Sequence, residues 1–520
     1  MADAVDGGAQ GRAEAYLGRR MVAVDYDSVD DGNVVQALQD AIPQYLSNRS
    51  QEIYLWRYYR GDQPILSRKK EVRPEINNRV VENHAQEIVS FKVGYQLAEP
   101  LQYTLRSHEG TAGPEGGNDE TEEGYDAHLK DLNELNTLMF AADKASCDRD
   151  LFEHMCVCGV GYRMVEASDG VDCPFELHVL DPWDTFVVHS SAYHHRPIMA
   201  VWVGRRQDGS KETVYNVYTA EKRYLVEGDR VVEAEPHTYG HIPIVEYRLN
   251  SVRMGAFETV LPLLDAINAV ESNRLDGVEQ TVQSLMKFVN CDVDEVTFAK
   301  MLELGAVKVS SPDGLKADVD FIRNDLDQSQ TQVTKDDLYQ AVVNIAGMPN
   351  RQSGGGSTSD TGAAVLLRDG WTLAETHAKN YELQFKRAER EFLRTVLEIC
   401  EQSKEATVDL RPRDVELTFN RRNYENVQVK SQVLTTMLSC DQIHPEIAFK
   451  SCGLFTDPEA AYLQSRRWAK ERADEGRAMA EAISSGGASG DVGEGPVPPA
   501  AGVPRLDDGD DAGAHALANA

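Results

Sequence analysis

Apolar residues recur every three or four positions in the first part of the chain. This spacing predicts helices over 45–60 and 77–93. In the second segment Val81, Ala85 and Lys92 fall on one stripe, so a lysine shares the face that is otherwise apolar.

A third helical stretch, 126–156, is followed by a region with the pattern of strands. Between 160 and 249, seven short segments rich in β-branched and aromatic residues are separated by turn residues. The sequence EGDR at 227–230 is typical of a hairpin turn. Helices followed by consecutive short strands predict an α+β domain with an antiparallel sheet.

The spacing becomes helical again at 257 and stays so to 290. At 1.5 Å per residue this helix would be about 50 Å long. The following segment, 291–327, predicts a small unit of one helix and two strands, and 328–346 predicts a second long helix. Gly347–Pro349 is a strong helix terminator.

Residues 349–362 form a glycine- and serine-rich loop, and a further long helix is predicted from there to about 403. Gly370 lies within that pattern and is a candidate kink, because glycine weakens a helix interior. The remaining ordered elements are predicted as a strand at 415–419 and helices at about 425–439, 444–451 and 457–482.

Charge is the unusual feature of the composition. The 520 residues include 53 basic and 85 acidic side chains, a net charge of −32. This balance argues against a protein that grips DNA by neutralising phosphates, but it leaves open a surface past which DNA slides. The length allows about three or four domains. No apolar run has the length of a signal peptide core or of a membrane span, so neither is expected.

Three segments lack periodicity. We expect a loose arm over 1–32, an exposed acidic loop at 108–124 and a disordered acidic tail over 483–520. The simpler interpretation of the two acidic segments is that they are solvent-exposed and keep the protein soluble. The alternative is that they bind a basic partner.

Motifs for catalysis and metal binding are missing from the sequence. No lysine follows the glycines of 349–362 as a P-loop requires, and neither G-x-S-x-G nor H-E-x-x-H occurs. His194 and His195 are adjacent on a predicted strand entrance and point to opposite faces, which disfavours a shared metal. The eight cysteines are sparse and predict free thiols rather than a zinc site. We therefore expect no enzyme, no metal and no cofactor.

The order of these elements resembles the portal proteins of tailed bacteriophages, specifically the siphophage type. No single motif is decisive, but the blocks occur in the right order over about 40–480. The blocks are YYRGDQPIL at 58–66, INNRVVENHAQEIVSFKVGYQLAEPLQY at 76–103, FEHMCVCGVGYRMVE at 152–166 with LDPWDTFVVHSS at 180–191, RMGAFETVLPLLDAINAVESNRLDGVE at 253–279, and NIAGMPNRQSGGGSTSDTGAAVLL at 344–367.

The resemblance implies a portal fold that assembles as a ring. Its parts would be an α/β wing, a long-helix stem, a small α/β clip and a helical crown. The implied bounds are a flexible arm at 1–32, the wing at 33–256, stem helices at 257–290 and 328–346, the clip at 291–327, a tunnel loop at 347–364, a long kinked helix with a wing strand at 365–424, the crown at 425–482 and the tail at 483–520.

The family's work is mechanical. The resemblance implies a ring of twelve subunits, with thirteen as an alternative for the isolated protein, that occupies one capsid vertex of the virion after assembly in the host cytoplasm. The ring would nucleate procapsid assembly, dock the terminase large subunit, conduct double-stranded DNA inward and outward, and join head to tail through an adaptor. Further partners would be the major capsid and scaffolding proteins, and no membrane is involved.

The resemblance also points to candidate contact residues. Those expected to approach the DNA backbone lie in the tunnel loop: Arg351, Gln352, Ser353, Gly354, Gly355, Gly356, Ser357 and Thr358. An intersubunit salt bridge is an equal alternative for Arg351. Arg274 and Lys287 are weaker candidates on the stem, where a solvated face explains them as well. In the clip, the residues expected to pair with a neighbouring subunit are Val307, Val309, Phe321 and Ile322.

Two other classes compete with this interpretation. A packaging nuclease or ATPase would need clustered metal carboxylates or a Walker motif, and the sequence has neither. Another capsid-associated protein such as a scaffold would be mostly extended helix, which the strand-rich region 160–249 contradicts.

Overall fold

The computed structural model describes most of the chain between residues 18 and 485. The described segments are 18–106, 118–170, 172–206, 212–282, 285–289, 318–322, 328–350, 370–403, 408–419, 427–440, 442–455 and 458–485, together with residues 294, 296, 298–300 and 421.

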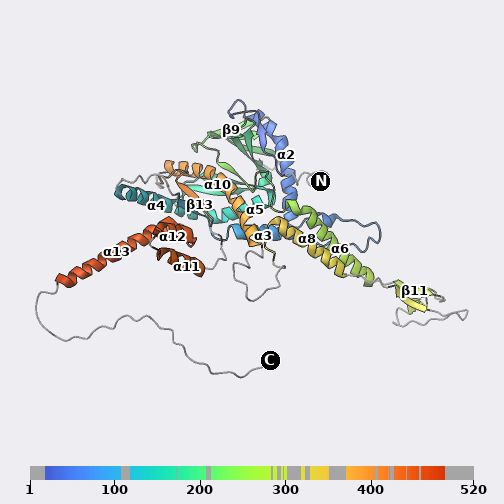
Figure 1. Cartoon of the computed structure of the whole chain (residues 1–520). Helices are drawn as coiled ribbons and strands as arrows, with labels where there is room; N and C mark the ends of the chain where they lie inside the picture. The colour runs from blue at the N-terminus through green and yellow to red at the C-terminus, as the bar shows by residue number, and fades with distance from the viewer. Residues whose placement is uncertain are drawn as a thin grey trace, which may run out of the picture.

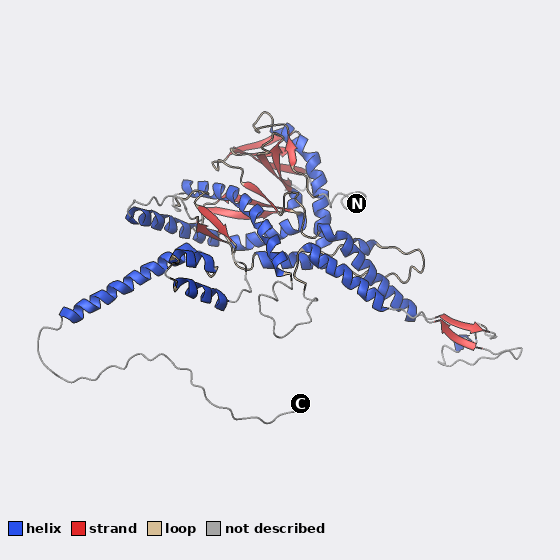
Figure 2. Ribbon diagram, in the orientation of Figure 1, coloured by secondary structure: helices blue, strands red, loops and turns tan. Residues whose placement is uncertain are grey.

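Helices and strands are both well represented in these segments (Figure 2). The helices are α2 (Val34–Tyr59), α3 (His84–Gln96), α4 (Asn118–Ala141), α5 (Lys144–Cys158), α6 (Leu261–Val282), α8 (Gln328–Ala346), α10 (Trp371–Gln402), α11 (Val427–Leu438), α12 (Pro445–Cys452) and α13 (Pro458–Ser485), with short 3₁₀ turns at Pro64–Ser67, Pro182–Asp184 and Glu258–Val260. The strands are β1 (Val22–Val24), β2 (Gln102–Leu105), β3 (Val160–Ala167), β4 (Phe175–Leu180), β5 (Thr185–Ser190), β6 (Pro197–Arg205), β7 (Thr213–Tyr218), β8 (Lys222–Glu227), β9 (Arg230–Pro236), β10 (Ile244–Arg248), β11 (Leu285–Val289), β12 (Asp318–Ile322) and β13 (Val415–Thr418).

Four sheets organise these strands. The largest has the order β1-β5-β6-β7-β8-β9, and the others are β10-β3-β4, β11-β12 and β13-β2. Only β1 pairs in parallel, with Val22 opposite Val188 on β5. The α+β class and the antiparallel strands expected between 160 and 249 are therefore confirmed. The predicted hairpin at 227–230 joins β8 to β9, with Glu227 opposite Arg230.

Helix α5 lies at the centre of the body, where it packs against α2, α3, β3 and β4 (Figure 1). Apart from the partly exposed Glu153 and His154, its C-terminal half is apolar, as expected for a helix largely surrounded by protein. Leu151, Phe152, Met155, Cys156 and Cys158 are all fully buried. Burial raises the pKa of Cys156 to about 12, so this thiol stays protonated.

The N-terminal boundary of the ordered body differs from the prediction. The arm expected over 1–32 is built into the wing from Gly18 onward, because β1 extends the large sheet. The Arg19 guanidinium donates to the Glu258 carboxylate across 2.5 Å, and both side chains are buried. This ion pair joins the segment before β1 to the 3₁₀ turn at Glu258–Val260.

Two helix starts also differ from the prediction. Helix α2 begins at Val34 rather than 45, with Pro43 inside it. Pro43 lacks the N–H of a helical residue, but the apolar stripe that precedes it packs on the large sheet and carries the helix through. Helix α3 begins at His84 rather than 77, because Asn83 caps it by accepting from the Gln86 N–H.

The stretch 126–156 forms two helices and not one. Asp143 has a φ of 49°, in the left-handed region, and it separates α4 from α5. Helix α4 also begins at Asn118, so the C-terminal part of the acidic segment 108–124 is helical instead of a loop.

The helix predicted over 257–290 is shorter than expected. After a 3₁₀ turn, α6 spans Leu261–Val282, and Leu285–Val289 is the strand β11. At 1.5 Å per residue, α6 is about 33 Å long instead of about 50 Å. The short apolar run LMKFV at 285–289 is compatible with both a helix and a strand. It forms a strand because it pairs with β12.

Gly370 does not kink a helix. It has a φ of 80° and precedes the first residue of α10, Trp371, as its N-cap. The strand at 415–419 and the three C-terminal helices were predicted correctly, and α13 extends to Ser485.

A buried ion network joins the central elements of the body. Glu389 on α10 binds Lys144 at 2.9 Å and Arg163 at 3.4 Å, and Asp148 on α5 binds the same two cations. All four side chains are buried. The hydroxyls of Tyr103 and Tyr247 each donate to Glu389 across 2.6 Å. Burial opposes ionisation of Glu389, but Lys144 and Arg163 hold its pKa below the ordinary value.

Replacing one member of this network should destabilise the fold. Glu389→Gln leaves Lys144 and Arg163 with a single carboxylate, and we expect the free energy of unfolding to fall by about 3–5 kcal/mol. Urea unfolding followed by circular dichroism measures the change. Glu391→Gln is the control, because Glu391 is 53% exposed and pairs only with Arg394 among described residues, so its effect should stay below about 1 kcal/mol. Equal effects of the two substitutions would contradict a structural role for the network.

Candidate functional site

Helices α6 and α8 form a two-helix projection with β11 and β12 beyond its far end (Figure 1). The two strands pair antiparallel, from Leu285 opposite Ile322 to Val289 opposite Asp318. The predicted helix 328–346 is confirmed by α8. The described parts of 257–346 therefore contain the two expected helices, the first shorter than predicted, and a strand pair of which only β12 was predicted as a strand.

An extended segment, 78–82, lies along α6 and is held by side chains of that helix. Three alternate backbone N–H groups of the segment donate to three polar side chains spaced four residues apart. The bonds join Asn78 to Asp276 (2.7 Å), Val80 to Ser272 (3.0 Å) and Glu82 to Asn268 (2.8 Å). The match is geometric, because two extended residues and four helical residues both advance about 6–7 Å.

The same three helix positions are buried, so their polar atoms need partners. Asn268 also donates to the Gln63 amide oxygen across 2.5 Å, and Asp276 accepts from Lys70 across 2.9 Å. Burial opposes ionisation of Asp276, but Lys70 and Asn78 hold its pKa below the ordinary value. We call 78–82 with Asn268, Ser272 and Asp276 the stem strap.

Ion pairs tie the projection to α3. Lys335 on α8 lies 2.5 Å from Glu82 and 2.9 Å from Glu271 on α6. His84, the first residue of α3, lies between Glu82 and Glu87, and its ring contacts Tyr339 on α8 with centroids 4.8 Å apart. Burial lowers the pKa of His84, but the two carboxylates outweigh it and raise the pKa overall.

The ends of the segment 347–370 meet at a common anchor. Gly347 follows α8 with a φ of 68°, and Gly370 precedes α10 with a φ of 80°, so both chain reversals use the left-handed region. A side chain at Gly347 would meet the His377 ring on α10 at 2.9 Å. A Cβ at Gly370 would lie 3.8 Å from the backbone of Met348 and Asn350. The two ends are therefore adjacent.

Lys92 of α3 fixes the α8 end of this anchor. Its ammonium donates to the Ala346 carbonyl across 2.7 Å and to the Tyr381 hydroxyl across 3.2 Å, and it lies 5.2 Å from the centroid of the Tyr381 ring. The Ala346 carbonyl belongs to the last turn of α8, where carbonyls lack helical partners and attract cations. Burial lowers the pKa of Lys92 to about 8.

Aromatic contacts fix the α10 end. The Trp371 ring lies 6.2 Å from Phe91 and 5.9 Å from Tyr95, both on α3. The Tyr95 hydroxyl donates to Glu375 across 2.8 Å. Helix α3 thus contacts both ends of 347–370, and we call Lys92, Gly347, Gly370 and Trp371 the loop anchor.

The predicted site residues are distributed as follows. Arg274 lies on α6, where it binds Glu271 at 3.3 Å and the Gln332 side chain on α8 at 2.8 Å. Lys287 lies on β11, opposite Asp320, rather than on a helix. Phe321 and Ile322 lie on β12 opposite Met286 and Leu285 of the same chain. The other predicted positions, Arg351, Gln352, Ser353, Gly354, Gly355, Gly356, Ser357, Thr358, Val307 and Val309, lie outside the described residues.

Contact of these residues with DNA or with a neighbouring subunit stays a prediction. Arg274 braces the two stem helices, so any approach to DNA would come from a guanidinium already bonded within the chain.

The sequence analysis missed the stem strap and the loop anchor. The signal for the anchor was present as Lys92 on an apolar stripe, and burial of that lysine explains it. For the strap the signal was a row of polar residues, Asn268, Ser272 and Asp276, on one face of α6. Neither signal identifies its partner, because the partners come from distant segments.

Neither a cluster of metal ligands nor a membrane-spanning helix is found among the described residues. They contain no group of three or more histidine, cysteine or carboxylate side chains placed to hold a metal ion. None of the described helices combines the length and the apolarity needed to cross a membrane.

The fold and the site define a class of α+β protein in which two long helices project from a larger body and both ends of 347–370 are fixed at the base of the projection. A family model described as phage portal protein, SPP1 Gp6-like, matches residues 38–478, and the chain belongs to this family. It therefore has a structural portal role at the capsid vertex of a virion, in a ring assembly at the head–tail junction.

Among solved structures, the chain is similar to a chain of the neck of a native GTA particle computed with C12 symmetry. The two share 12% identity over 78% of this chain and 93% of that chain, with a TM-score of 0.42. No curated protein matches the chain. The family match contradicts the scaffold alternative.

Removing one strap side chain should loosen the stem. Ser272→Ala leaves the partly buried Val80 N–H without its acceptor, and we expect the free energy of unfolding to fall by about 1 kcal/mol. Limited proteolysis should then cut within 68–82 faster than in the unmodified protein. Glu279→Ala, on the exposed surface of the same helix, should change neither quantity. Unchanged cleavage in Ser272→Ala would show that the strap does not depend on this bond.

The Lys92 ammonium should give the stability a characteristic pH dependence. The pKa is about 8 in the folded chain and about 10.5 in the unfolded chain. Between these values the unfolded chain binds more protons at this residue, so stability from this group rises with pH. The melting temperature of the unmodified protein should therefore rise relative to Lys92→Met from pH 8 to 10. Lys379→Met, at a 67% exposed position on α10, should follow the unmodified profile. Parallel profiles for all three proteins would refute the buried ammonium.

Proposed function

We propose that twelve copies of this chain form a closed ring at one capsid vertex and that the ring conducts double-stranded DNA during packaging and ejection. The observation that carries this proposal is the portal family match across 38–478. A head-to-tail interface closes into a ring when its rotation divides the circle, so one repeated contact is enough to build it. The role is mechanical, and no catalytic step is assigned to the chain.

Exposed apolar residues on the stem support packing between copies. Leu275 and Val278 on α6 are 44% and 41% exposed, and Val333 on α8 is 59% exposed. Apolar side chains on a narrow projection gain stability when a neighbouring copy covers them. Stems from adjacent subunits would then surround the channel, with the described strands β11 and β12 in the clip.

The negative net charge of the chain supports a channel through which DNA slides without being tightly bound. Twelve copies at −32 each give 12 × −32 = −384 for the ring. A surface of this sign binds phosphates weakly, so DNA can move past it. The segment 347–364, with Arg351 to Thr358, is proposed as the tunnel loop that approaches the DNA backbone.

The remaining partners are proposed from the same family membership. The ring would nucleate procapsid assembly with the scaffolding and major capsid proteins in the host cytoplasm. It would then dock the terminase large subunit, and finally the adaptor that joins head to tail. The proposed parts are the wing, which begins at Gly18 because β1 belongs to its large sheet and ends at 256, the stem, the clip and the crown at 425–482.

Deleting 352–358 should separate assembly from DNA movement. The deletion leaves the described loop anchor in place, so native mass spectrometry and electron-microscope class averages should still give rings of about twelve or thirteen copies. Packaging yield, measured as DNA protected from nuclease in assembled heads, should fall by at least about tenfold. Normal packaging would refute the tunnel-loop role. Absence of rings for the unmodified chain, even on co-expression with scaffold and capsid proteins, would refute the channel.

A further inference from the structure

A basic hollow of about 320 Å³ lies between α10 and the β13–β2 pair. Its cationic side chains come from two sources that the fold brings together. They are Lys386, Arg390 and Arg394 on α10, and Arg106 and Arg413 beside the strand pair. The three α10 residues are spaced by four and share one helix face. The Arg106 N–H donates to the Asp414 carbonyl across 2.9 Å, which places Arg106 beside the segment that leads into β13.

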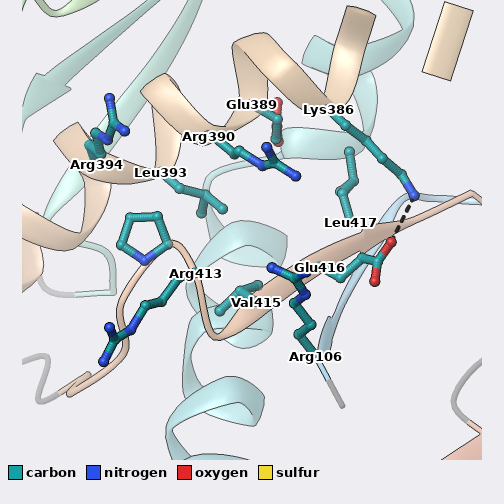
Figure 3. A pocket seen from close by; sticks show the side chains of 11 residues that line it. Arg106, Lys386, Glu389, Arg390, Leu393, Arg394, Arg413, Val415, Glu416 and Leu417 are labelled. Atoms are coloured by element: carbon teal, nitrogen blue, oxygen red, sulfur yellow. Dashed lines mark hydrogen bonds and ion pairs between the residues drawn. The ribbon is translucent and has the colours of Figure 1, made fainter. Parts of the chain in front are cut away.

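The hollow keeps an excess of positive charge after its internal pairs are counted. Lys386 binds Glu416 at 3.1 Å, Arg394 binds Glu391 at 2.6 Å, and Arg413 lies 3.5 Å from Asp414. Figure 3 shows the Lys386–Glu416 pair at the edge of the hollow and Arg394 pointing away from it, while Arg390 and Arg106 extend over the same space. Glu389 also lines the hollow, but it is committed to Lys144 and Arg163 beneath. Among described residues, no ion pair neutralises Arg390.

Such a cluster is unusual in a chain with a net charge of −32. Like charges brought together repel one another, so the arrangement costs stability unless a partner supplies the opposite charge. Guanidinium groups bind carboxylates through two parallel hydrogen bonds, which favours an acidic peptide as that partner. Leu393, Val415 and Leu417 are buried beneath the cations and form the apolar floor of the hollow.

The chain itself contains a segment with this chemistry. Leu506 is followed by Asp507 and Asp508, and then by Asp510 and Asp511. A span of 20 residues, 486–505, separates Ser485, where α13 ends, from Leu506. Such a span reaches about 70 Å when extended and about 25 Å as a flexible coil. A hollow of 320 Å³ holds a few side chains, so it suits this short segment better than a DNA duplex.

We propose that the basic hollow binds the acidic segment 506–511 of this chain, from the same copy or from another copy. The inference does not rest on the proposed channel, because it needs only the charge and shape of the hollow. Binding of the segment would neutralise Arg390 and would place residues 506–511 against α10.

The test uses full-length protein in which the segment is neutralised by D507N, D508N, D510N and D511N. A fluorescent peptide of residues 503–513 is added at low salt, and fluorescence anisotropy reports binding. The peptide should bind this variant more tightly than the unmodified protein, whose own segment competes. Adding Arg390→Glu or Arg106→Glu should weaken binding at least about fivefold for each charge, and high salt should abolish it. Arg477→Glu, 81% exposed on α13, is the matched control and should have no effect.

Three outcomes would overturn the proposal. One is equal binding to the unmodified and neutralised proteins, and another is binding that survives both arginine reversals. The third is displacement of the peptide by an equimolar short DNA duplex, which would identify a phosphate site instead. Circular dichroism of each variant confirms that it folds before binding is measured. A peptide with asparagine at all four aspartate positions should not bind.

Discussion

The buried ion network around Glu389 is the constraint on which the rest of the structure depends. It joins α5, α10, β3 and, through two tyrosine hydroxyls, β2 and β10, so five elements from distant parts of the sequence meet at one carboxylate. Two cations and two anions make the cluster neutral, which is what allows the charges to remain in a desolvated interior. An apolar contact would tolerate sliding of α10 along the sheet. Directed ionic bonds fix its position and its rotation.

The position of α10 in turn determines two surfaces. Its N-terminus forms half of the loop anchor, and its outer face carries the cations of the basic hollow. The stem formed by α6 and α8 needs further stabilising contacts, because a projection of two helices buries too little apolar surface by itself. The stem strap supplies hydrogen bonds from buried side chains of α6, and Lys335 adds ion pairs between α6, α8 and the residue Glu82 just before α3. The base of the projection joins the main hydrophobic core through Leu264, Ile267 and Val342, and polar contacts hold it further along α6 and α8.

The local pattern of apolar and polar residues was enough to predict the type of those elements that pack against segments close to them in the sequence. The antiparallel strands β5 to β9 and helix α8 were predicted for this reason. The errors occur where a distant segment decides the outcome. Pro43 is tolerated because α2 packs on the sheet, and the β11 segment is a strand because β12 pairs with it. Arg19 is ordered by Glu258, which lies 239 residues further along the chain. The Lys92 signal was visible, but its acceptor at Ala346 was not.

Helix α3 holds both ends of 347–370, so the positions of these ends do not depend on α8 and α10 alone. Lys92 of α3 donates to the Ala346 carbonyl at the end of α8, and Phe91 and Tyr95 of the same helix contact Trp371 at the start of α10. Gly347 and Gly370 have positive φ, which other residues adopt only with strain. Because one helix contacts both ends, the end of α8 and the start of α10 are fixed relative to each other by the same body that the Glu389 network holds together.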